Sequence, residues 1–382
     1  MNPIFAVAVV TAAAAWVAVL LWSAKPWSTR ERIAAASPSA GPGRLTVLIP
    51  ARNEAAMIGT CLRSVLAQGP AVSAIVVDDR STDNTVACVQ AFDRDRVKLV
   101  TGQPLPDGWT GKLWALEQGI RRVRTDRVLL LDADIVLGPG MLAALAGHLE
   151  RDRLGMLSVM ARLRSKTFWE RLLMPAYVYF FKLLYPFAWV NSTRHARAAA
   201  AGGCVLLRIE ALDGIGGFES LRGALIDDCT LAQRVKQHGW PIRIVLSGGV
   251  GSLRVYARFA DVLKLVSRTA YTQLHYSPAL LLACTVAMLT LFVVPVAAMV
   301  SAPPALATAG LIAYAAMALS FLPTLRFYEL HGLRALLLPL VATTYLLMTW
   351  YSALQYWQGA GAVWKARRYD RSMSSASQGQ PR

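Results

Sequence analysis

The sequence predicts an α/β domain with a parallel sheet at its centre, together with transmembrane helices towards both ends of the chain. Two observations lead to this prediction. Residues 44–100 alternate short β-branched runs with helical segments joined by short loops, which is the pattern of consecutive βαβ units. Long apolar runs lie outside this central region, and 55% of the 382 residues are apolar, which is high for an ordinary soluble enzyme.

The chain is strongly basic, with a formal net charge of +17 from 40 Lys and Arg against 23 Asp and Glu. Arginine-rich flanks on an apolar chain favour a bilayer with anionic headgroups over nucleic acid, for which the sequence has no motif. The five cysteines are scattered without a CxxC pair, which argues against disulfides or a zinc site and suits a reducing compartment. They are Cys61, Cys88, Cys204, Cys229 and Cys284.

The first element is an apolar run over residues 4–22, long enough to cross the roughly 30 Å hydrocarbon core of a bilayer. Lys25, Arg30 and Arg32 follow it, which by the positive-inside rule places the next domain in the cytoplasm. No basic residues precede the run, so an uncleaved anchor is favoured over a signal peptide. We assign residues 1–24 to this anchor and residues 25–44 to a linker that ends in "SPSAGPGR".

The central region begins with three strand-like runs, "RLTVLIP", "SAIVVDD" and "RVKLV", separated by the helical segments "EAAMIGTCLRSVLAQG" and "STDNTVACVQAF". In parallel sheets, ligands bind at the carboxyl ends of the strands. Polar residues follow three of the predicted strands: residues 50–54, residues 78–81 and the Asp132-Ala133-Asp134 triplet. Each set alone is compatible with a helix N-cap, but three acidic strand ends on one edge favour a binding site.

The triplet places two carboxylates close together at the end of the apolar run "LLL". Like charges at this range repel and raise each other's pKa, so a compensating charge is expected. A divalent cation, Mg²⁺ or Mn²⁺, is the candidate because hard cations take carboxylate oxygens as ligands.

The segments "VLIPARNEA", "VVDDRSTDNT" and "LLLDADI" resemble, in this order, the donor-site motifs of the family 2 glycosyltransferases. These enzymes have the GT-A fold and use nucleotide-diphosphate sugars, and the resemblance covers about residues 45–240. It implies that residues 50–54 hold the uridine, with Glu54 near the ribose, and that Asp79 bonds the uracil edge. The implied donor-binding residues are Pro50, Ala51, Arg52, Glu54, Asp79, Lys112 and Asp132, and the implied metal ligands are Asp134 and Asp132.

The stretch "GKLWALEQG" resembles the family's segment in which a lysine begins a helix that faces the donor diphosphate. Lys112 is that lysine, and a solvated surface lysine is the alternative. Glu117 stands where the family usually has Asn, so the role of that position is open.

Two further segments resemble the acceptor side of the family. "AAGGC" supplies Gly202 and Gly203 on a glycine-rich strand that approaches the acceptor. "GALIDDCTLAQR" supplies the acid pair Asp227-Asp228, with Asp227 in place of the commoner Glu. The resemblance makes Asp228 the general base of an inverting transfer, and a helix-capping acid pair is the alternative.

Residues 168–190 are apolar and aromatic but contain charges, so they are expected to lie in the membrane interface with the charges at headgroup level. Asp134 and Asp228 must lie in one compartment, so the chain between them cannot cross the bilayer only once. Residues 168–190 therefore lie in the interface or make an even number of crossings. The following basic segment is amphipathic and contains no Gln-x-x-Arg-Trp motif, which argues against a long processive polymerase.

Three further apolar runs cover residues 279–300, 305–325 and 335–357. Three crossings from a cytoplasmic domain would leave the basic tail outside, against the positive-inside rule. Either one run is re-entrant or interfacial, or the tail is an exception. The expected domains are the GT-A catalytic domain 45–260 with the interfacial helix 168–190, an amphipathic segment 261–277, transmembrane helices 278–358 and a basic disordered tail 359–382.

This layout resembles the hopene-associated glycosyltransferases and is similar to the ceramide-type glucosyltransferases. The resemblance implies a UDP-sugar donor, a lipid acceptor of hopanoid type, and a multi-pass protein of a bacterial-type inner membrane. The alternatives are a processive polysaccharide synthase and a non-enzymatic membrane protein that retains a nucleotide-binding fold. The retained acids Asp79, Asp132, Asp134 and Asp228 argue against the last.

Overall fold

The computed structural model describes residues 3–37, 41–224, 226–359, 363–364 and 367–368. The chain forms two compact units. A helical unit contains residues 1–30, 165–186 and 255–362, and an α/β unit contains residues 31–164, 187–254 and 363–382.

The α/β unit is built on a mixed sheet with the strand order β3-β2-β1-β4-β7-β6-β8-β5. Strands β3, β2, β1 and β4 run parallel, and β7 is antiparallel to both β4 and β6. The strands are β1 Leu45–Ala51, β2 Val72–Asp78, β3 Val97–Thr101, β4 Arg127–Leu131, β5 Ile135–Leu137, β6 Met156–Arg162, β7 Cys204–Arg208 and β8 Ile242–Ser252.

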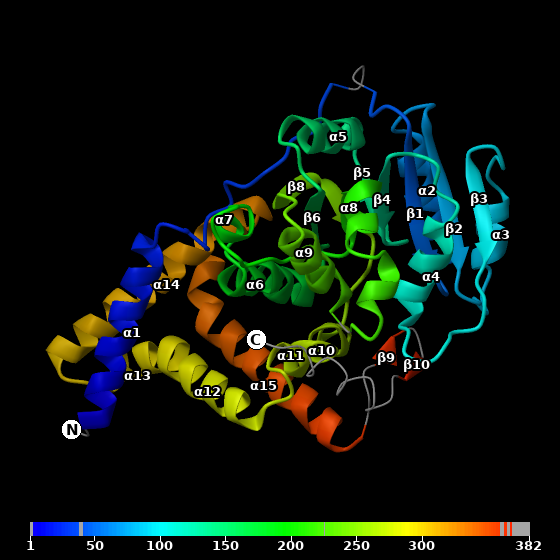
Figure 1. Cartoon of the computed structure of the whole chain (residues 1–382). Helices are drawn as coiled ribbons and strands as arrows, with labels where there is room; N and C mark the ends of the chain where they lie inside the picture. Colours follow the sequence, from blue (N-terminus) through cyan, green and yellow to red (C-terminus); the bar gives the residue numbers. More distant parts are fainter. Residues whose placement is uncertain (1–2, 38–40, 225, 360–362, 365–366, 369–382) are drawn as a thin grey trace. The chain divides into compact units, whose positions relative to one another are not determined.

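The predicted βαβ order is confirmed in the first part of this sheet. Every residue of β1 is buried, as expected for a parallel strand that is covered on both faces. The register aligns Ala51 at the end of β1 with Asp78 at the end of β2, and β4 pairs with β1 on its other side. The carboxyl ends of β2, β1 and β4 therefore meet at one edge of the sheet, as the sequence predicts (Figure 1).

Helices cover the sheet through apolar faces. In α2 (Ile58–Leu66), Ile58, Cys61, Leu62 and Val65 recur at helical spacing and are all buried in the core. The other helices of this unit are α3 Thr85–Gln90, α4 Gly111–Ile120, α5 Met141–Arg151, α7 Phe187–Val190, α8 Ile209–Gly214, α9 Asp227–Gln237 and the 3₁₀ helix η1 Phe218–Leu221.

In the described part of the helical unit, four helices are long and apolar enough to cross a membrane: Pro3–Leu21, Pro278–Ser301, Pro304–Phe327 and Gly332–Trp357. They coincide with the four predicted apolar runs. The elements of this unit are α1 Pro3–Leu21, α6 Phe168–Leu184, α10 Phe259–Ser267, α11 Ala270–Gln273, α12 Pro278–Met288, the π-helical η2 Leu289–Val293, α13 Val294–Ser301, α14 Pro304–Phe327, the 3₁₀ helix η3 Gly332–Leu337 and α15 Leu338–Trp357.

The aromatic stretch 168–190 differs from its expected description. It forms two helices, α6 and α7, separated at Tyr185-Pro186; α6 belongs to the helical unit and α7 to the α/β unit. Of its charged side chains, Glu170 and Lys182 are buried in the protein and Arg171 is exposed; the placement of the stretch in the membrane interface stays a prediction. Backbone groups hold the two buried side chains, because Lys182 Nζ donates to the carbonyl of Ser28 and Glu170 accepts from backbone N–H groups.

The predicted disordered tail, residues 359–382, lies outside the described residues except for Gly359 and one short pair of strands. These are β9 Val363–Trp364 and β10 Arg367–Arg368, which pair antiparallel.

Candidate active site

The turn that follows β1 is joined to the turn that follows β2. The Arg52 guanidinium donates to the carbonyl oxygen of Asp79 at 2.5 Å and lies 3.8 Å from its carboxylate. Asn53 has a left-handed backbone (φ 53°), which Asn adopts more readily than most residues, and its N–H donates to Ser81 Oγ at 2.9 Å. The two strand ends are thereby fixed relative to each other.

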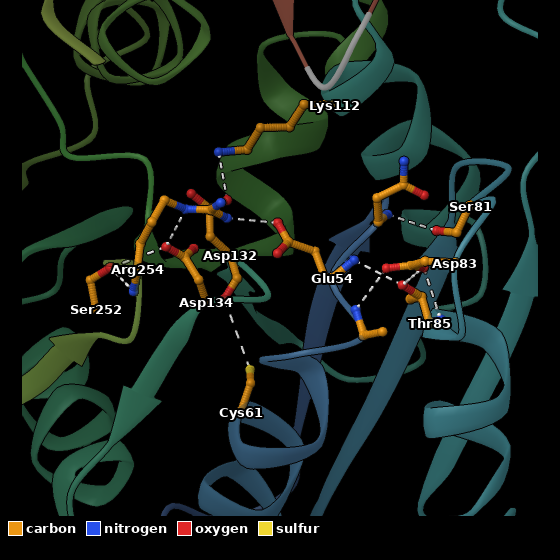
Figure 2. Close-up of polar contacts among 12 residues, drawn as sticks. Glu54, Cys61, Ser81, Asp83, Thr85, Lys112, Asp132, Asp134, Ser252 and Arg254 are labelled. Atoms are coloured by element: carbon orange, nitrogen blue, oxygen red, sulfur yellow. Dashed lines mark hydrogen bonds and ion pairs between the residues drawn. The ribbon is translucent and has the colours of Figure 1, made fainter. Parts of the chain in front are cut away.

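Glu54 is fixed in the same way (Figure 2). Its N–H donates to Thr85 Oγ1 at 2.8 Å, and the N–H of Ala55 donates to Asp83 Oδ2 at 3.1 Å. Slight burial raises the pKa of Asp83, but hydrogen bonds from Thr85 and Ala55 outweigh it and hold that pKa below its usual value. Asp83 therefore stays ionised and keeps the loop closed. Glu54 is 5% exposed and Asp79 is 2% exposed, so both predicted donor-binding acids are buried at this edge.

The Asp132-Ala133-Asp134 triplet forms the turn between β4 and β5. Backbone hydrogen bonds hold it: the N–H of Asp132 donates to the carbonyl of Gly203 at 3.0 Å, and the N–H of Leu253 donates to the carbonyl of Asp134 at 2.7 Å. The turn is therefore tied to the strand end β7 on one side and to the end of β8 on the other.

Lys112 lies in the first turn of α4, whose N-terminus is capped by the Thr110 side chain. Its Nζ lies 2.8 Å from Asp132 Oδ1 and donates to the carbonyl of Gly202 at 3.2 Å. Burial lowers the pKa of Lys112, but Asp132 and the acid pair of α9 raise it well above the usual value. The alternative of a solvated surface lysine is wrong, because this ammonium group is held between Asp132 and Gly202.

Arg254 is a site residue that the sequence analysis missed. Its Nε donates to Asp134 Oδ2 at 3.1 Å, and its Nη2 donates to Glu54 Oε1 at 2.8 Å. Ser252 Oγ also donates to Asp134 Oδ2, at 3.0 Å. Figure 2 shows the guanidinium between the two carboxylates. The sequence indicates Arg254 only as a basic residue shortly after the long strand β8.

The acid pair stands at the start of α9. Asp228 Oδ2 accepts from the N–H of Gly202 at 2.7 Å, and Oδ1 accepts from the N–H of Cys229 at 2.8 Å. Burial and the neighbouring Asp227 raise the pKa of Asp228 to about 6, although Lys112 opposes the shift. A carboxyl group with this pKa is suited to accept a proton near neutral pH.

Gly202 makes the approach of Asp228 possible. A Cβ atom at position 202 would lie 2.9 Å from Asp228 Oδ2 and 3.1 Å from its Cβ, so a larger residue would displace the carboxylate. At Gly203, a Cβ atom would lie 3.8 Å from Asp132 Oδ2, which is an ordinary contact. The structure therefore explains the first glycine sterically, whereas the second contributes its carbonyl to the triplet turn.

Polar groups of the site and apolar side chains together line a small cleft. Its polar residues are Lys112, Gly202, Asp227 and Asp228. Its apolar lining consists of Leu113, Leu116, Leu130, Val205, Phe218, Leu221 and Leu231. The other predicted donor residues do not line this cleft: Pro50 and Ala51 lie in β1, and Arg52, Glu54 and Asp79 lie at the turns after β1 and β2. Asp132 pairs with Lys112 of this cleft, and Arg254 links Asp134 to Glu54 at the turn after β1.

The donor set fits a divalent cation whose remaining ligands come from a nucleotide. In the described part of the chain, no group of three or more His, Cys, Asp or Glu side chains is arranged to hold a metal ion. Asp132 and Asp134 nevertheless present two carboxylates from one turn, and Mg²⁺ is commonly held by one or two carboxylates, substrate phosphates and water. A self-contained metal cage is therefore not present among these residues, but a site completed by a diphosphate is compatible with them.

Comparisons with known proteins agree with this architecture. Residues 42–272, more than half of the chain, match the family model described as "Glycosyltransferase like family 2". The 4,4'-diaponeurosporenoate glycosyltransferase of Staphylococcus aureus (strain MRSA252) is 36% identical over 129 residues, which are 33% of this chain and 34% of that protein. The corresponding protein of strain USA300 is 35% identical over the same length. The match thus spans about a third of these relatives.

Two solved structures are also similar. A mannosyltransferase from Pyrobaculum calidifontis in complex with GDP-Man and Mn²⁺ has a TM-score of 0.49 and 19% identity, covering 91% of this chain and 99% of that one. Glucosyl-3-phosphoglycerate synthase from Mycobacterium tuberculosis, in complex with Mn²⁺, UDP and glucosyl-3-phosphoglycerate, has a TM-score of 0.39 and 21% identity, covering 62% and 82%. The family model matches more than half of the chain, and the sheet has the expected parallel strands. The chain therefore belongs to the family 2 glycosyltransferases of the GT-A fold.

Proposed function

We propose that the protein transfers a sugar from a nucleotide-diphosphate donor to a lipid acceptor at a membrane. The observation that carries this proposal is the contact of Lys112 with both Asp132 and Gly202, because Gly202 also binds the Asp228 carboxylate. A cation for a diphosphate and a carboxylate suited to act as a base are thereby held side by side.

On the donor side, residues 50–54 and Asp79 are proposed to hold the nucleoside, with Glu54 near the ribose. Lys112 and the N-terminus of α4 supply positive charge for the diphosphate. Asp134 and Asp132 would hold Mg²⁺ or Mn²⁺, which supplies Lewis-acid stabilisation of the departing nucleotide diphosphate when it is bound.

On the acceptor side, Asp228 is the proposed general base. The acceptor hydroxyl oxygen forms a bond to C1 of the sugar while the bond from C1 to the diphosphate oxygen breaks. The hydroxyl proton passes to the Asp228 carboxylate, and the bonding electron pair leaves with the nucleotide diphosphate. Attack from the face opposite the leaving group inverts the configuration at C1. Asp227 keeps the pKa of Asp228 raised and so strengthens its basicity.

A lipid acceptor is supported by the helical unit, whose four apolar helices suit a membrane-bound protein. The curated relatives are named as glycosyltransferases of 4,4'-diaponeurosporenoate. For this chain we propose a hopanoid-type lipid and a UDP-sugar. We also propose a cytoplasmic catalytic domain on a bacterial inner membrane, because Lys25, Arg30 and Arg32 follow the first helix.

The test incubates membranes that contain the protein with a panel of labelled UDP- and GDP-sugars and measures the label in extracted lipid. Wild type should label a lipid with one donor, EDTA should abolish the labelling and Mn²⁺ should restore it. Asp228→Asn should lose it. Asp152→Asn is the control, because Asp152 pairs with Arg243 outside the site. The absence of label from every donor would contradict the proposal, and label in a long polymer would indicate a polysaccharide synthase.

A further inference from the structure

We propose that Arg254 occupies the place of the divalent cation in the donor-free protein and moves to the diphosphate when cation and nucleotide bind together. This inference rests on the proposed function, because it assigns a role within the same donor site. It makes Arg254 a positioning residue that couples metal binding to nucleotide binding.

The geometry of the guanidinium is that of a bridging cation. Arg254 uses two different nitrogen atoms for two different acids, Nε for Asp134 and Nη2 for Glu54. The Asp134 side chain is 13% exposed and the Glu54 side chain 6% exposed, so neither carboxylate is well solvated. Two buried carboxylates that share one guanidinium would repel each other without it. The guanidinium thus supplies the charge compensation that a metal ion would supply.

Asp134 Oδ2 also accepts from Ser252, so this oxygen already has two donors. A cation that binds this oxygen must displace Arg254. Arginine stays protonated at any physiological pH, so a displaced guanidinium needs another anion. Its planar fork matches the geometry of phosphate, and the diphosphate would be the anion that arrives together with the metal. Metal alone would then bind poorly, and metal with nucleotide would bind well.

The backbone around Arg254 is fixed, so only its side chain has to move. The N–H of Leu253 donates to the carbonyl of Asp134, and the N–H of Arg254 donates to Ser252 Oγ at 3.2 Å. The guanidinium side chain is 32% exposed, which leaves it an open side towards solvent.

The experiment compares purified full-length wild type with Arg254→Gln and Arg254→Lys in detergent. Arg243→Gln is the matched control, because Arg243 lies in strand β8, is also 32% exposed and pairs with Asp152. Electron paramagnetic resonance measures the binding of Mn²⁺ alone. Calorimetry measures the binding of UDP and of GDP with Mn²⁺ and with EDTA.

Arg254→Gln should bind Mn²⁺ alone at least about tenfold more tightly than wild type, a factor that corresponds to about 1.4 kcal/mol. The same variant should bind the nucleotide with Mn²⁺ at least about tenfold more weakly, because the diphosphate loses a bidentate partner. Arg254→Lys keeps the charge but cannot bridge both acids. Its affinities for Mn²⁺ alone and for the nucleotide with Mn²⁺ should lie between those of wild type and Arg254→Gln. Arg243→Gln should match wild type in both measurements.

Loss of a merely structural arginine would not tighten the binding of Mn²⁺ alone while weakening the binding of the nucleotide. If Arg254→Gln weakens both Mn²⁺ and nucleotide binding, Arg254 only holds Asp134 in position, and the inference is wrong. Unchanged Mn²⁺ binding in that variant also overturns it. Either result leaves sugar transfer by the wild type intact, whereas failure of the proposed function is the absence of transfer from every donor.

Discussion

The substitution Asp228→Asn separates the proposed base from the groups that bind the donor. Asn keeps the size of the side chain and one oxygen acceptor for the N–H groups of Gly202 and Cys229, but it cannot take up the acceptor proton. We expect kcat to fall by about 10²–10⁴, the usual cost of losing a general base. The affinity for the nucleotide should stay near the wild-type value, because Lys112 and Asp134 are unchanged.

The pKa of Asp228 gives this prediction a pH signature. The ordinary value is 3.8 and the folded protein raises it to about 6, mainly through burial and then through Asp227. Wild-type kcat should therefore fall about tenfold per pH unit below about pH 6, as the base takes up a proton. The same shift acts on stability. Because the folded pKa is the higher one, the contribution of Asp228 is complete below pH 3.8 and is lost as the pH rises to about 6. This loss amounts to about 3 kcal/mol.

The assay is transfer of labelled sugar to lipid between pH 5 and pH 9, with thermal unfolding measured on the same samples from pH 4 to pH 8. Asp228→Asn should lack both the acidic limb of kcat and the fall in stability. Asp227→Asn is the comparison: removing a neighbouring charge should shift the acidic limb to lower pH, and the weaker base should lower the rate far less than Asp228→Asn does. Transfer by Asp228→Asn at a near wild-type rate would mean that the acid pair is only a helix cap.

Three further predictions concern Gly202, Glu170 and the charged loop 326–334. Gly202→Ala should lower kcat at least about tenfold with little change in nucleotide affinity, because its Cβ would meet the Asp228 carboxylate at 2.9 Å. Glu170→Gln should lower the free energy of unfolding by about 2 kcal/mol and the melting temperature by about 4–8 °C, because a charged acceptor of the Tyr256 N–H is lost; an unchanged melting curve would contradict this. The charged loop 326–334 should be cytoplasmic, so a cysteine placed there should react with an impermeant maleimide only after cells are opened; labelling of intact cells would show the opposite topology.

Much of the fold follows from local pattern. The strand β1 was predicted because a β-branched run over residues 45–49 is followed by a turn, and the four membrane-length helices were predicted because an apolar run of that length has few other uses. The common edge of β1, β2 and β4 follows from the rule that βαβ units make parallel strands. These inferences need only neighbouring residues and general topology.

The contacts that the sequence did not reveal join residues that are far apart in the chain. Arg254 meets Asp134 only because β5 and β8 pair antiparallel, with Ile135 opposite Ser252. Nothing in either segment specifies that register. Glu170 and Lys182 were visible as charges in an apolar stretch. The spacing of Thr167 and Glu170 is that of a helix capping box, which explains the bond from the Thr167 N–H to Glu170. The other partners, the Tyr256 N–H and the Ser28 carbonyl, lie far away in the chain, and no local pattern indicates them. The sequence therefore predicts that these positions are polar, but it does not predict which distant groups they bind.

The structure changes the interpretation of the two carboxylates in the Asp132-Ala133-Asp134 triplet. The sequence suggested that Asp132 and Asp134 tolerate each other because a divalent cation lies between them. In the structure each carboxylate has a cation of the chain itself, Lys112 for Asp132 and Arg254 for Asp134, so the pair does not require a metal in order to fold. When a diphosphate binds, its negative charge competes with Asp132 and Asp134 for Lys112 and Arg254. A divalent cation that binds with the diphosphate would compensate the added negative charge. The need for metal should therefore lie in donor binding rather than in stability, and the melting temperature of the donor-free protein should be the same with Mn²⁺ and with EDTA.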